Sequence, residues 1–259
     1  MNIPDTMKPS RKLLSFALAS VISASAQADF VGLNIGANVW TPDIKGSFSS
    51  TTAGSTSAIN MNNDLGYKDH SSKSLNISFE HPVPLLPNIR YSGSDLNASS
   101  SSIPSSSVSF NAKTFSNTIN STLDLSHNDV VLYYELLDNW INLDLGIDLK
   151  MFDGKVSMID PTDSANNTSI PVDETIPMLY IAARFDLPLT GFYVGANIQQ
   201  LSVGDSSAED RSIMLGYESK MGLGIEGGIK SFTLELDNAN NLNTNLEYDG
   251  LYLNGYYHF

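Results

Sequence analysis

The chain has 259 residues, enough to bury a sizeable core, and it contains no cysteine, so disulfide scaffolds, thiolate metal sites and cysteine nucleophiles are excluded. A formal charge of −14 with only 16% charged residues excludes the basic surface that a nucleic-acid-binding protein needs. A hydrophobic share of 41%, with 18 Gly, 11 Tyr and 11 Phe, favours a folded all-β protein.

The first 28 residues are typical of a secretory signal peptide. Three cations precede the apolar run 13–22, and small residues then lead to Ala26 and Ala28, which form an A-x-A cleavage site. The run is too short for a transmembrane helix, which needs about 20 apolar residues. We therefore predict a cleaved signal peptide over 1–28 and a single exported domain over 29–259.

Alternation of apolar and polar residues, which puts side chains on opposite faces of a strand, recurs in ten segments. In chain order the predicted strands are 30–40, 73–81, 88–95, 129–136, 140–152, 178–185, 192–201, 212–218, 222–236 and 250–259. The clearest is 140–152, where one face is apolar and the other carries Asp144, Asp148 and Lys150. In 222–236 the apolar residues change from odd to even positions, which predicts a β-bulge near Gly228 or Ser231.

The connections between these segments alternate in length. The long ones, rich in Ser, Asn, Asp and Gly, are 41–72, 96–128, 153–177, 202–211 and 237–249, and the short ones are 82–87, 137–139, 186–191 and 219–221. Outer-membrane barrels have an even number of strands, short periplasmic turns and long extracellular loops. We therefore predict a transmembrane antiparallel up-and-down β-barrel of about ten strands, within roughly 8–12. The Ser-rich runs 47–57 and 99–109 lack the hydrophobic content for a core of their own.

A soluble secreted β-sandwich is the competing interpretation, because its strands alternate in the same way. The strongly charged polar face of 140–152 and the aromatic C-terminus favour the barrel. Phe259, with Tyr257 two residues before it, is similar to the C-terminal signal recognised by the outer-membrane assembly machinery, although Gly255 lies beside the usual glycine position of that signal. We expect a monomer in the outer membrane, surrounded by lipid and lipopolysaccharide, that reaches it through this machinery.

Several short motifs resemble a family of uncharacterised outer-membrane β-barrel proteins of Gram-negative bacteria. The motifs are Glu80-His81-Pro82-Val83-Pro84-Leu85-Leu86-Pro87-Asn88, Asp124-Leu125-Ser126-His127, Leu132-Tyr133-Tyr134-Glu135, Leu137-Asp138-Asn139-Trp140, Phe152-Asp153-Gly154 and Tyr256-Tyr257-His258-Phe259. The similarity spans the whole segment after the signal peptide. It implies the barrel fold and the outer-membrane location, and it supplies no active site.

The polar faces of the predicted strands place nine charged residues inside the barrel. They are Glu80, Arg90, Glu135, Asp144, Asp148, Lys150, Arg184, Glu226 and Lys230. A barrel of this size is narrow enough for side chains to fill, and an unpaired buried charge costs several kcal/mol. We therefore predict a lumen filled by a salt-bridge and tyrosine network, and a structural or surface-interaction role. The acidic excess leaves open a narrow, weakly cation-preferring path for small solutes.

Other motifs point less clearly to chemistry. Gly222, Gly224 and Gly227 match a dinucleotide-binding pattern, but they lead into a strand and not into a helix. Ser126, His127 and Asp129 are residue types of a hydrolase triad, although neighbours on a strand point to opposite faces. A hydrolase at the barrel rim, built on His127 and Asp129, is the third alternative.

Metal and cofactor chemistry has little support in the sequence. The acidic segment 237–249 is of a type that binds calcium weakly, but a solvated polar loop explains it as well. His70, His81 and His258 are isolated and show no metal-ligand spacing. We predict no cofactor, no metal, no nucleic-acid partner and no catalytic activity.

Overall fold

The structure is a computed structural model that describes residues 31–52, 58–239 and 241–259. The predicted signal peptide, with Ala26 and Ala28, lies outside these residues, as does the first residue of the strand predicted from Phe30. Within the described ranges, no helix is long and apolar enough to cross a membrane.

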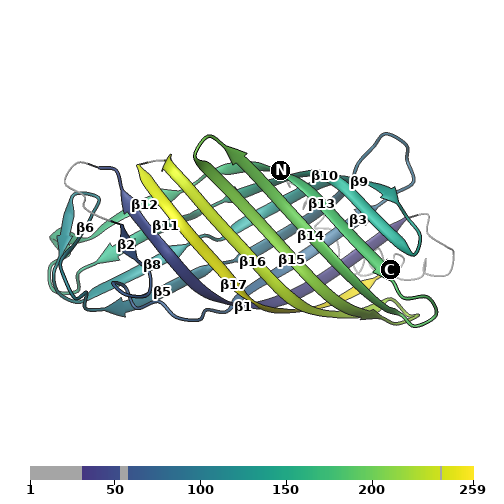
Figure 1. Ribbon diagram of the computed structural model, residues 1–259, viewed down its shortest axis with the longest axis horizontal. Coiled ribbons are helices and arrows are strands. Elements are labelled where there is room, and N and C mark those ends of the chain that lie inside the picture. The colour runs from purple at the N-terminus through teal and green to yellow at the C-terminus, as the bar shows by residue number, and fades with distance from the viewer. Residues whose placement is uncertain (1–30, 53–57, 240) are drawn as a thin grey trace, which may run out of the picture.

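Ten long strands form one antiparallel sheet that closes on itself (Figure 1). In chain order they are β1 (Gly32–Ser50), β3 (Ser72–Glu80), β4 (Asn88–Asp95), β9 (His127–Leu137), β10 (Ile141–Phe152), β13 (Thr175–Asp186), β14 (Phe192–Val203), β15 (Ser206–Glu218), β16 (Leu223–Ala239) and β17 (Leu242–His258). Each pairs with the next, and β17 pairs with β1 from Asn34↔His258 to Ser50↔Leu242. The predicted all-β, antiparallel, ten-stranded barrel is therefore confirmed.

The two ends of the barrel differ. One end, called the short-turn end, carries the turns 81–87, 138–140, 187–191 and 219–222 together with the C-terminus (Figure 1). The other, called the long-connection end, carries further elements. They are β2 (Ile59–Asn60), β5 (Asn97–Ser102), β6 (Val108–Phe110), β7 (Lys113–Phe115), β8 (Ile119–Asp124), β11 (Gly154–Ile159), β12 (Thr168–Val172) and the 3₁₀-helix η2 (Ser164–Asn166). The strands β5, β8, β11 and β12 form a second sheet, and β6 pairs with β7.

The outer wall toward the short-turn end is apolar. On β10 the outward residues run from Ile141 to Leu149, and Ile147 between them is 57% exposed. We call this band the apolar belt. Its other exposed members include Ile35, Val39, Leu75, Ile77, Leu132, Leu179, Val194, Ile213, Leu215, Ile225, Ile229, Leu251 and Leu253.

Aromatic side chains ring the belt at the short-turn end. Trp140 packs edge-on against Phe185 with ring centroids 5.4 Å apart, and Phe192 lies 5.0 Å from Tyr217. Aromatic girdles of this kind mark the boundary of the hydrocarbon layer in membrane barrels.

Above the belt the polarity of the two faces of these strands reverses: outward positions become polar and inward positions become apolar. On β16 the outward residue Ile229 is 62% exposed, whereas the inward residues Phe232 and Leu234 are 1% exposed. β17 behaves alike: Leu253 faces out in the belt, and Leu246 is fully buried above it. The wall of the long-connection end is therefore polar outside and apolar inside, as in a water-soluble protein.

The prediction of a β-bulge near Gly228 or Ser231 is wrong, and this reversal of polarity explains the pattern that suggested it. The pairing of β16 with β17 is regular from Leu223 to Leu236, and the first shift in register comes between Leu236 and Ala239. The change from odd to even apolar positions thus reflects a change of surroundings, with even-numbered side chains pointing inward throughout. Two predicted long connections, 202–211 and 237–249, are for the same reason mostly strand.

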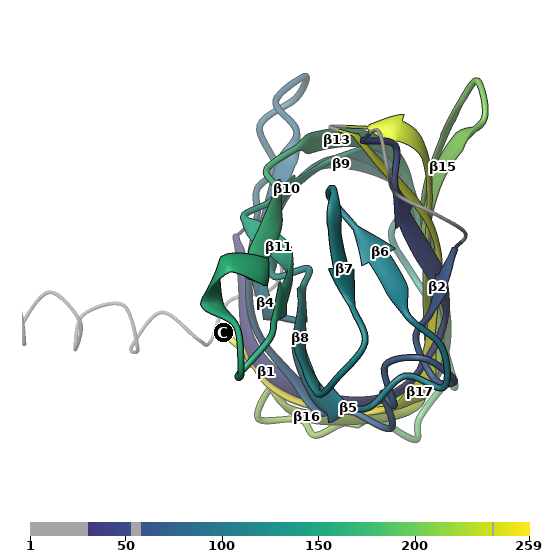
Figure 2. The ribbon, with the colours of Figure 1, turned by 90° about the vertical axis from the view of Figure 1, so that its left-hand side faces the viewer.

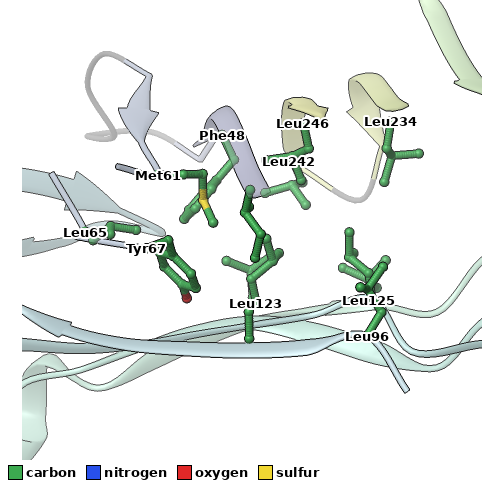
Figure 3. Close-up of a cluster of buried hydrophobic side chains, with 14 of the residues drawn as sticks. Phe48, Met61, Leu65, Tyr67, Leu96, Leu123, Leu125, Leu234, Leu242 and Leu246 are labelled. Carbon is green, nitrogen blue, oxygen red and sulfur yellow. The ribbon is translucent and has the colours of Figure 1, made fainter. Parts of the chain in front are cut away.

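The long connections, which were predicted to lack the hydrophobic content for a core of their own, contribute to a shared core. Their apolar residues, among them Ile44, Phe48, Val108, Phe110 and Leu123, join residues of β16 and β17 in one large buried cluster (Figure 3). We call this cluster the upper core. Its residues are too sparse in any one connection to predict a core, and they meet only because the strands bring five connections together.

The hairpin β6–β7 lies inside the ring of strands at the long-connection end (Figure 2). Its two turn residues, Asn111 and Ala112, both have positive φ, as a tight two-residue hairpin turn requires. The ring of Phe110 packs edge-on against Phe48, 5.4 Å between centroids. Asn111 also donates a hydrogen bond of 2.8 Å to Thr168, so the hairpin is tied to β12.

Candidate functional site

The barrel interior below the upper core is the candidate site. All nine charged residues predicted to face inward lie on the inward-facing positions of their strands. The structure gathers seven of them into three groups, which we name after their central residues Lys150, Arg90 and Glu218.

The Lys150 cluster lies directly beneath the upper core. The ammonium of Lys150, fully buried, is 2.8 Å from Asp129 and 3.4 Å from Asp210. Lys230 lies 3.2 Å from the same Asp210 carboxylate. Two cations and two carboxylates from four strands therefore neutralise one another inside the wall. Such pairing is what allows charges to be buried at all.

Asp148 lies in the same layer, but its carboxylate differs in hydrogen bonding from those of Asp129 and Asp210. It lies two residues from Lys150 on the same face of β10, and its side chain is fully buried. Neither of its carboxylate oxygens accepts a hydrogen bond from any of the described residues.

The Arg90 cluster occupies the next layer toward the short-turn end. Arg90 donates a 2.8 Å hydrogen bond to the hydroxyl of Tyr180, and its guanidinium lies 5.5 Å from the ring centres of both Tyr180 and Tyr133. Tyr133 in turn donates a 2.6 Å hydrogen bond to Glu80. Both tyrosines are fully buried, so in this layer two aromatic rings pack around one cation.

The Glu218 cluster lies at the short-turn end. Glu218 accepts hydrogen bonds from Tyr256 at 2.9 Å and from Arg184 at 3.3 Å, and His258 Nδ1 lies 3.2 Å away. The guanidinium of Arg184 lies 3.7 Å from the ring centre of Tyr193, which donates a 2.8 Å hydrogen bond to Glu226.

Two glycines make room for these rings. A Cβ at Gly216 would lie 2.1 Å from the ring of Tyr193, and a Cβ at Gly224 would lie 2.1 Å from the ring of Tyr256. The rings can therefore lie flat against the wall only where the wall has no side chain. This accounts for Gly224 in the motif Gly222-x-Gly224-x-x-Gly227, which leads into strand β16 and not into a helix.

Two further predicted residues, Glu135 and Asp144, lie beside the Arg90 cluster, and Asp144 interacts electrostatically with Arg90 and Glu80. They face each other as cross-strand neighbours of β9 and β10, with a register shift beside them. Glu135 is exposed near the short-turn end.

Among the residues of the hydrolase alternative, Ser126 has a partner of its own, and His127 lies beside Asp129. Ser126 accepts a hydrogen bond from the backbone amide of Leu96 at 3.2 Å. The ring of His127 lies 2.8 Å from the carbonyl of Leu125 through Nδ1, and its Nε2 is 3.8 Å from Asp129. His127 is 6% exposed, so it lies in the barrel interior and not at an open rim.

The predicted assembly-signal residues lie at the end of β17. Tyr257 pairs with Ile35 on β1, and the ring of Phe259 packs edge-on at 4.5 Å from that of Tyr257. The backbone amide of Phe259 donates to the carbonyl of Leu33 at 2.8 Å. The C-terminus is thus part of the seam that closes the barrel.

Among the titratable groups of the long-connection end, Tyr67 is buried in the upper core, and burial raises its pKa to about 12. In the acidic turn that precedes η2, the pKa of Asp160 is lowered because Thr162 donates two hydrogen bonds to its carboxylate. No group of His, Asp or Glu in the described part of the chain is arranged to hold a metal ion.

Sequence reasoning named the central cations and missed many of their partners. Glu218, Tyr133, Tyr180 and Tyr256 lie on inward positions of predicted strands, so the alternation could have found them, whereas Asp210 lies in the predicted connection 202–211, which is strand in the structure. Their pairing depends on which strands face each other across the lumen, and a single strand's pattern carries no such information.

No protein-family model and no curated protein matches the chain. Solved structures that it resembles include the outer membrane protease OmpT from Escherichia coli, with 11% identity, a TM-score of 0.42 and coverage of 87% of this chain and 97% of that one. The translocator domain of the autotransporter NalP from Neisseria meningitidis has 11% identity, a TM-score of 0.43 and coverage of 96% of both chains. A Pseudomonas aeruginosa FadL homologue has 8% identity, a TM-score of 0.36 and coverage of 88% and 90%.

Similarity at this level of sequence identity and TM-score does not assign a role to any residue. The class of the protein is defined by its own strand pairings, which make it a closed antiparallel ten-stranded β-barrel.

Proposed function

We propose that the chain is an integral outer-membrane β-barrel with a closed lumen and a structural or surface-interaction role. The short-turn end would face the periplasm, and the long-connection end would project above the outer leaflet. Its immediate partners would be lipid and lipopolysaccharide around the belt, and the assembly machinery at β17.

The apolar belt carries this proposal. On β10 it extends from Ile141 to Leu149. Eight steps of about 3.3 Å give roughly 26 Å along the strand. At a usual tilt of about 40° this is roughly 20 Å along the barrel axis, close to the ~25 Å apolar band of outer-membrane barrels. A water-soluble barrel would not leave Leu75 and Leu251 each 68% exposed on such a continuous band.

Two groups of side chains, one above the other along the barrel axis, support a closed lumen. The three charged clusters occupy the interior at the level of the belt, and Lys150, Tyr133 and Tyr180 in them are fully buried. The upper core and the β6–β7 hairpin fill the interior above them. Side chains therefore pack the barrel at both levels, as expected for a barrel of this strand number.

An accessibility experiment in a Gram-negative host tests the orientation. A short epitope inserted in the connection 160–167 should bind antibody on intact cells, whereas the same epitope in the turn 187–191 should bind only after the outer membrane is permeabilised. Equal labelling of both on intact cells, or recovery of the folded protein in the detergent-free soluble fraction, would overturn the proposal.

A narrow cation path is the second candidate, and Asp148 is the observation that favours it. The buried carboxylate of Asp148 has no hydrogen-bond partner among the described residues. It is therefore available for transient contact with water or a cation. Planar-bilayer recordings separate the two candidates. We expect no reproducible open state, while an open state that Asp148→Asn or Asp144→Asn abolishes would favour transport.

A further inference from the structure

The barrel wall opens between β13 and β14 just above the belt. Their pairing ends at Leu179↔Gln200, although β13 begins at Thr175 and β14 continues to Val203. Residues 175–178 and 201–203 therefore lie on diverging strands. The hairpin formed by β14 and β15 projects outward from the ring of strands at this place (Figure 2).

A pocket with a volume of about 230 Å³ lies in this opening. Phe152, Val172 and Ile176 line one side, and Leu201, Ala208 and Leu234 line the other. Four of these are nearly inaccessible, with Phe152 3%, Val172 5%, Ala208 2% and Leu234 1% exposed. The pocket is thus a recess in the upper core and not a dent in the outer surface.

The lining is apolar in chemistry as well as in composition. Nine of the twelve lining residues are apolar, the others being Glu174, Ser206 and Ser207. Ser207 donates a 3.2 Å hydrogen bond to Glu235, and the hydroxyl of Ser206 accepts one of 3.0 Å from the Asp237 amide. Each serine hydroxyl therefore has a hydrogen-bond partner in the protein, and the third polar residue of the lining is Glu174.

We infer that this recess binds a small apolar molecule, of the size of a single aromatic ring or a short alkyl chain. An apolar cavity of about 150 Å³ is enough to bind benzene, whereas drug-sized ligands occupy pockets of roughly 300–1,000 Å³. The 230 Å³ recess lies between these limits. Burial of the apolar surface of both partners supplies the driving force.

The position of the mouth favours entry from the membrane surface. Leu179, the last paired residue of β13, faces outward in the belt and is 53% exposed. The opening begins directly above it, and this step rests on the proposed membrane position, which puts the boundary between hydrocarbon and water at that level. An apolar molecule dissolved in the hydrocarbon, or an acyl chain bent upward from it, reaches the mouth from below, and either source presents the same chemistry to the recess.

The test uses the whole protein in phospholipid nanodiscs, with fluorobenzene as the probe and ¹⁹F NMR as the readout. Ala208→Phe fills the recess, and Val203→Asp puts a carboxylate at its mouth, where Val203 is 65% exposed and folding is not at risk. Ser202→Asp is the matched control, because Ser202 is an exposed neighbour outside the lining. We expect at least tenfold weaker binding in the first two variants and unchanged binding in Ser202→Asp.

Two further measurements identify the source of the bound molecule and the position at which it binds. Native mass spectrometry that finds phospholipid on the wild type but not on Ala208→Phe assigns the recess to a lipid tail, and its absence with fluorobenzene bound assigns it to a free molecule. In xenon-pressurised crystals the wild type should show xenon between β13 and β14. Failure of the wild type to bind fluorobenzene, phospholipid and xenon there, or equal binding by Ala208→Phe, Val203→Asp and the wild type, would overturn the inference.

Discussion

The sharpest test of the belt is an arginine on its mid-line. Leu145 faces outward on β10, four residues from Ile141 and four from Leu149, so it lies at mid-height. An arginine facing lipid costs about 2–4 kcal/mol at the bilayer midplane and about 0–1 kcal/mol near the interfaces. We therefore expect Leu145→Arg to lower the folded-to-unfolded ratio by about 30-fold to 700-fold.

Urea titration of refolding into phosphatidylcholine vesicles measures this loss, with Trp40 and Trp140 as fluorescent reporters. Leu149→Arg, at the belt edge, should cost about 0–1 kcal/mol. Asn245→Arg provides a control, because Asn245 is an outward, exposed residue of β17 above the belt and should change stability by at most about 0.5 kcal/mol. The inward substitution Asp144→Asn should also be milder than Leu145→Arg.

The expected order is Leu145→Arg well above Leu149→Arg, and both at or above Asn245→Arg. Equal costs at Leu145 and Asn245 would mean that both residues face the same solvent. That result would refute the assignment of the belt to hydrocarbon, and with it the outer-membrane location.

Three further predictions concern the interior and the upper core. Lys150→Met leaves Asp129 without its 2.8 Å partner and should cost about 3–5 kcal/mol in the same urea titration, and a loss below about 1 kcal/mol would contradict the buried pairing. Phe110→Ala should cost the upper core about 3–5 kcal/mol, seen as faster hydrogen exchange in β6 and β7. Exchange that instead quickens equally in β10 would show that the upper core and the belt unfold as one unit. Because burial raises the pKa of Tyr67 to about 12, above its unfolded value of about 10, the stability that this residue contributes is complete below about pH 10 and is lost as the pH rises through 12. The difference in phenolate absorbance between wild type and Tyr67→Phe should therefore appear near pH 12, and its appearance near pH 10 would contradict the burial.

The belt portions of the ten strands could be predicted from the sequence because the apolar surroundings that we propose for the belt impose the same rule on each. Outward residues such as Ile147 and Leu253 must be apolar where they meet hydrocarbon, whereas inward ones such as Asp148 are free to be polar. Period-two alternation therefore identifies each strand without knowledge of its neighbours. It also places the central cations Lys150 and Arg90 on the inner face.

The upper halves of the same strands were missed for a physical reason. Above the belt the outward residues are hydrated, as Glu247 and Asn245 are, and the apolar ones turn inward, as Leu246 and Tyr248 do. A search for apolar outward faces ends where the solvent changes. The partners inside the lumen were missed because Asp210 meets Lys150 only when strands distant in sequence face each other.

The exchange of faces implies that two different forces stabilise one continuous set of strands. In the proposed membrane position no water drives apolar side chains together in the belt, so stability there comes from backbone hydrogen bonds in hydrocarbon and from the buried clusters of Lys150 and Arg90. In the upper core, Phe48 and Phe110 are buried against water, and the hydrophobic effect acts as it does in soluble proteins. The recess between β13 and β14 lies where these two regimes meet. Strands that no longer need to exclude lipid and are not yet enclosed by the upper sheet can separate there at little cost, and this is why an apolar opening forms at that height.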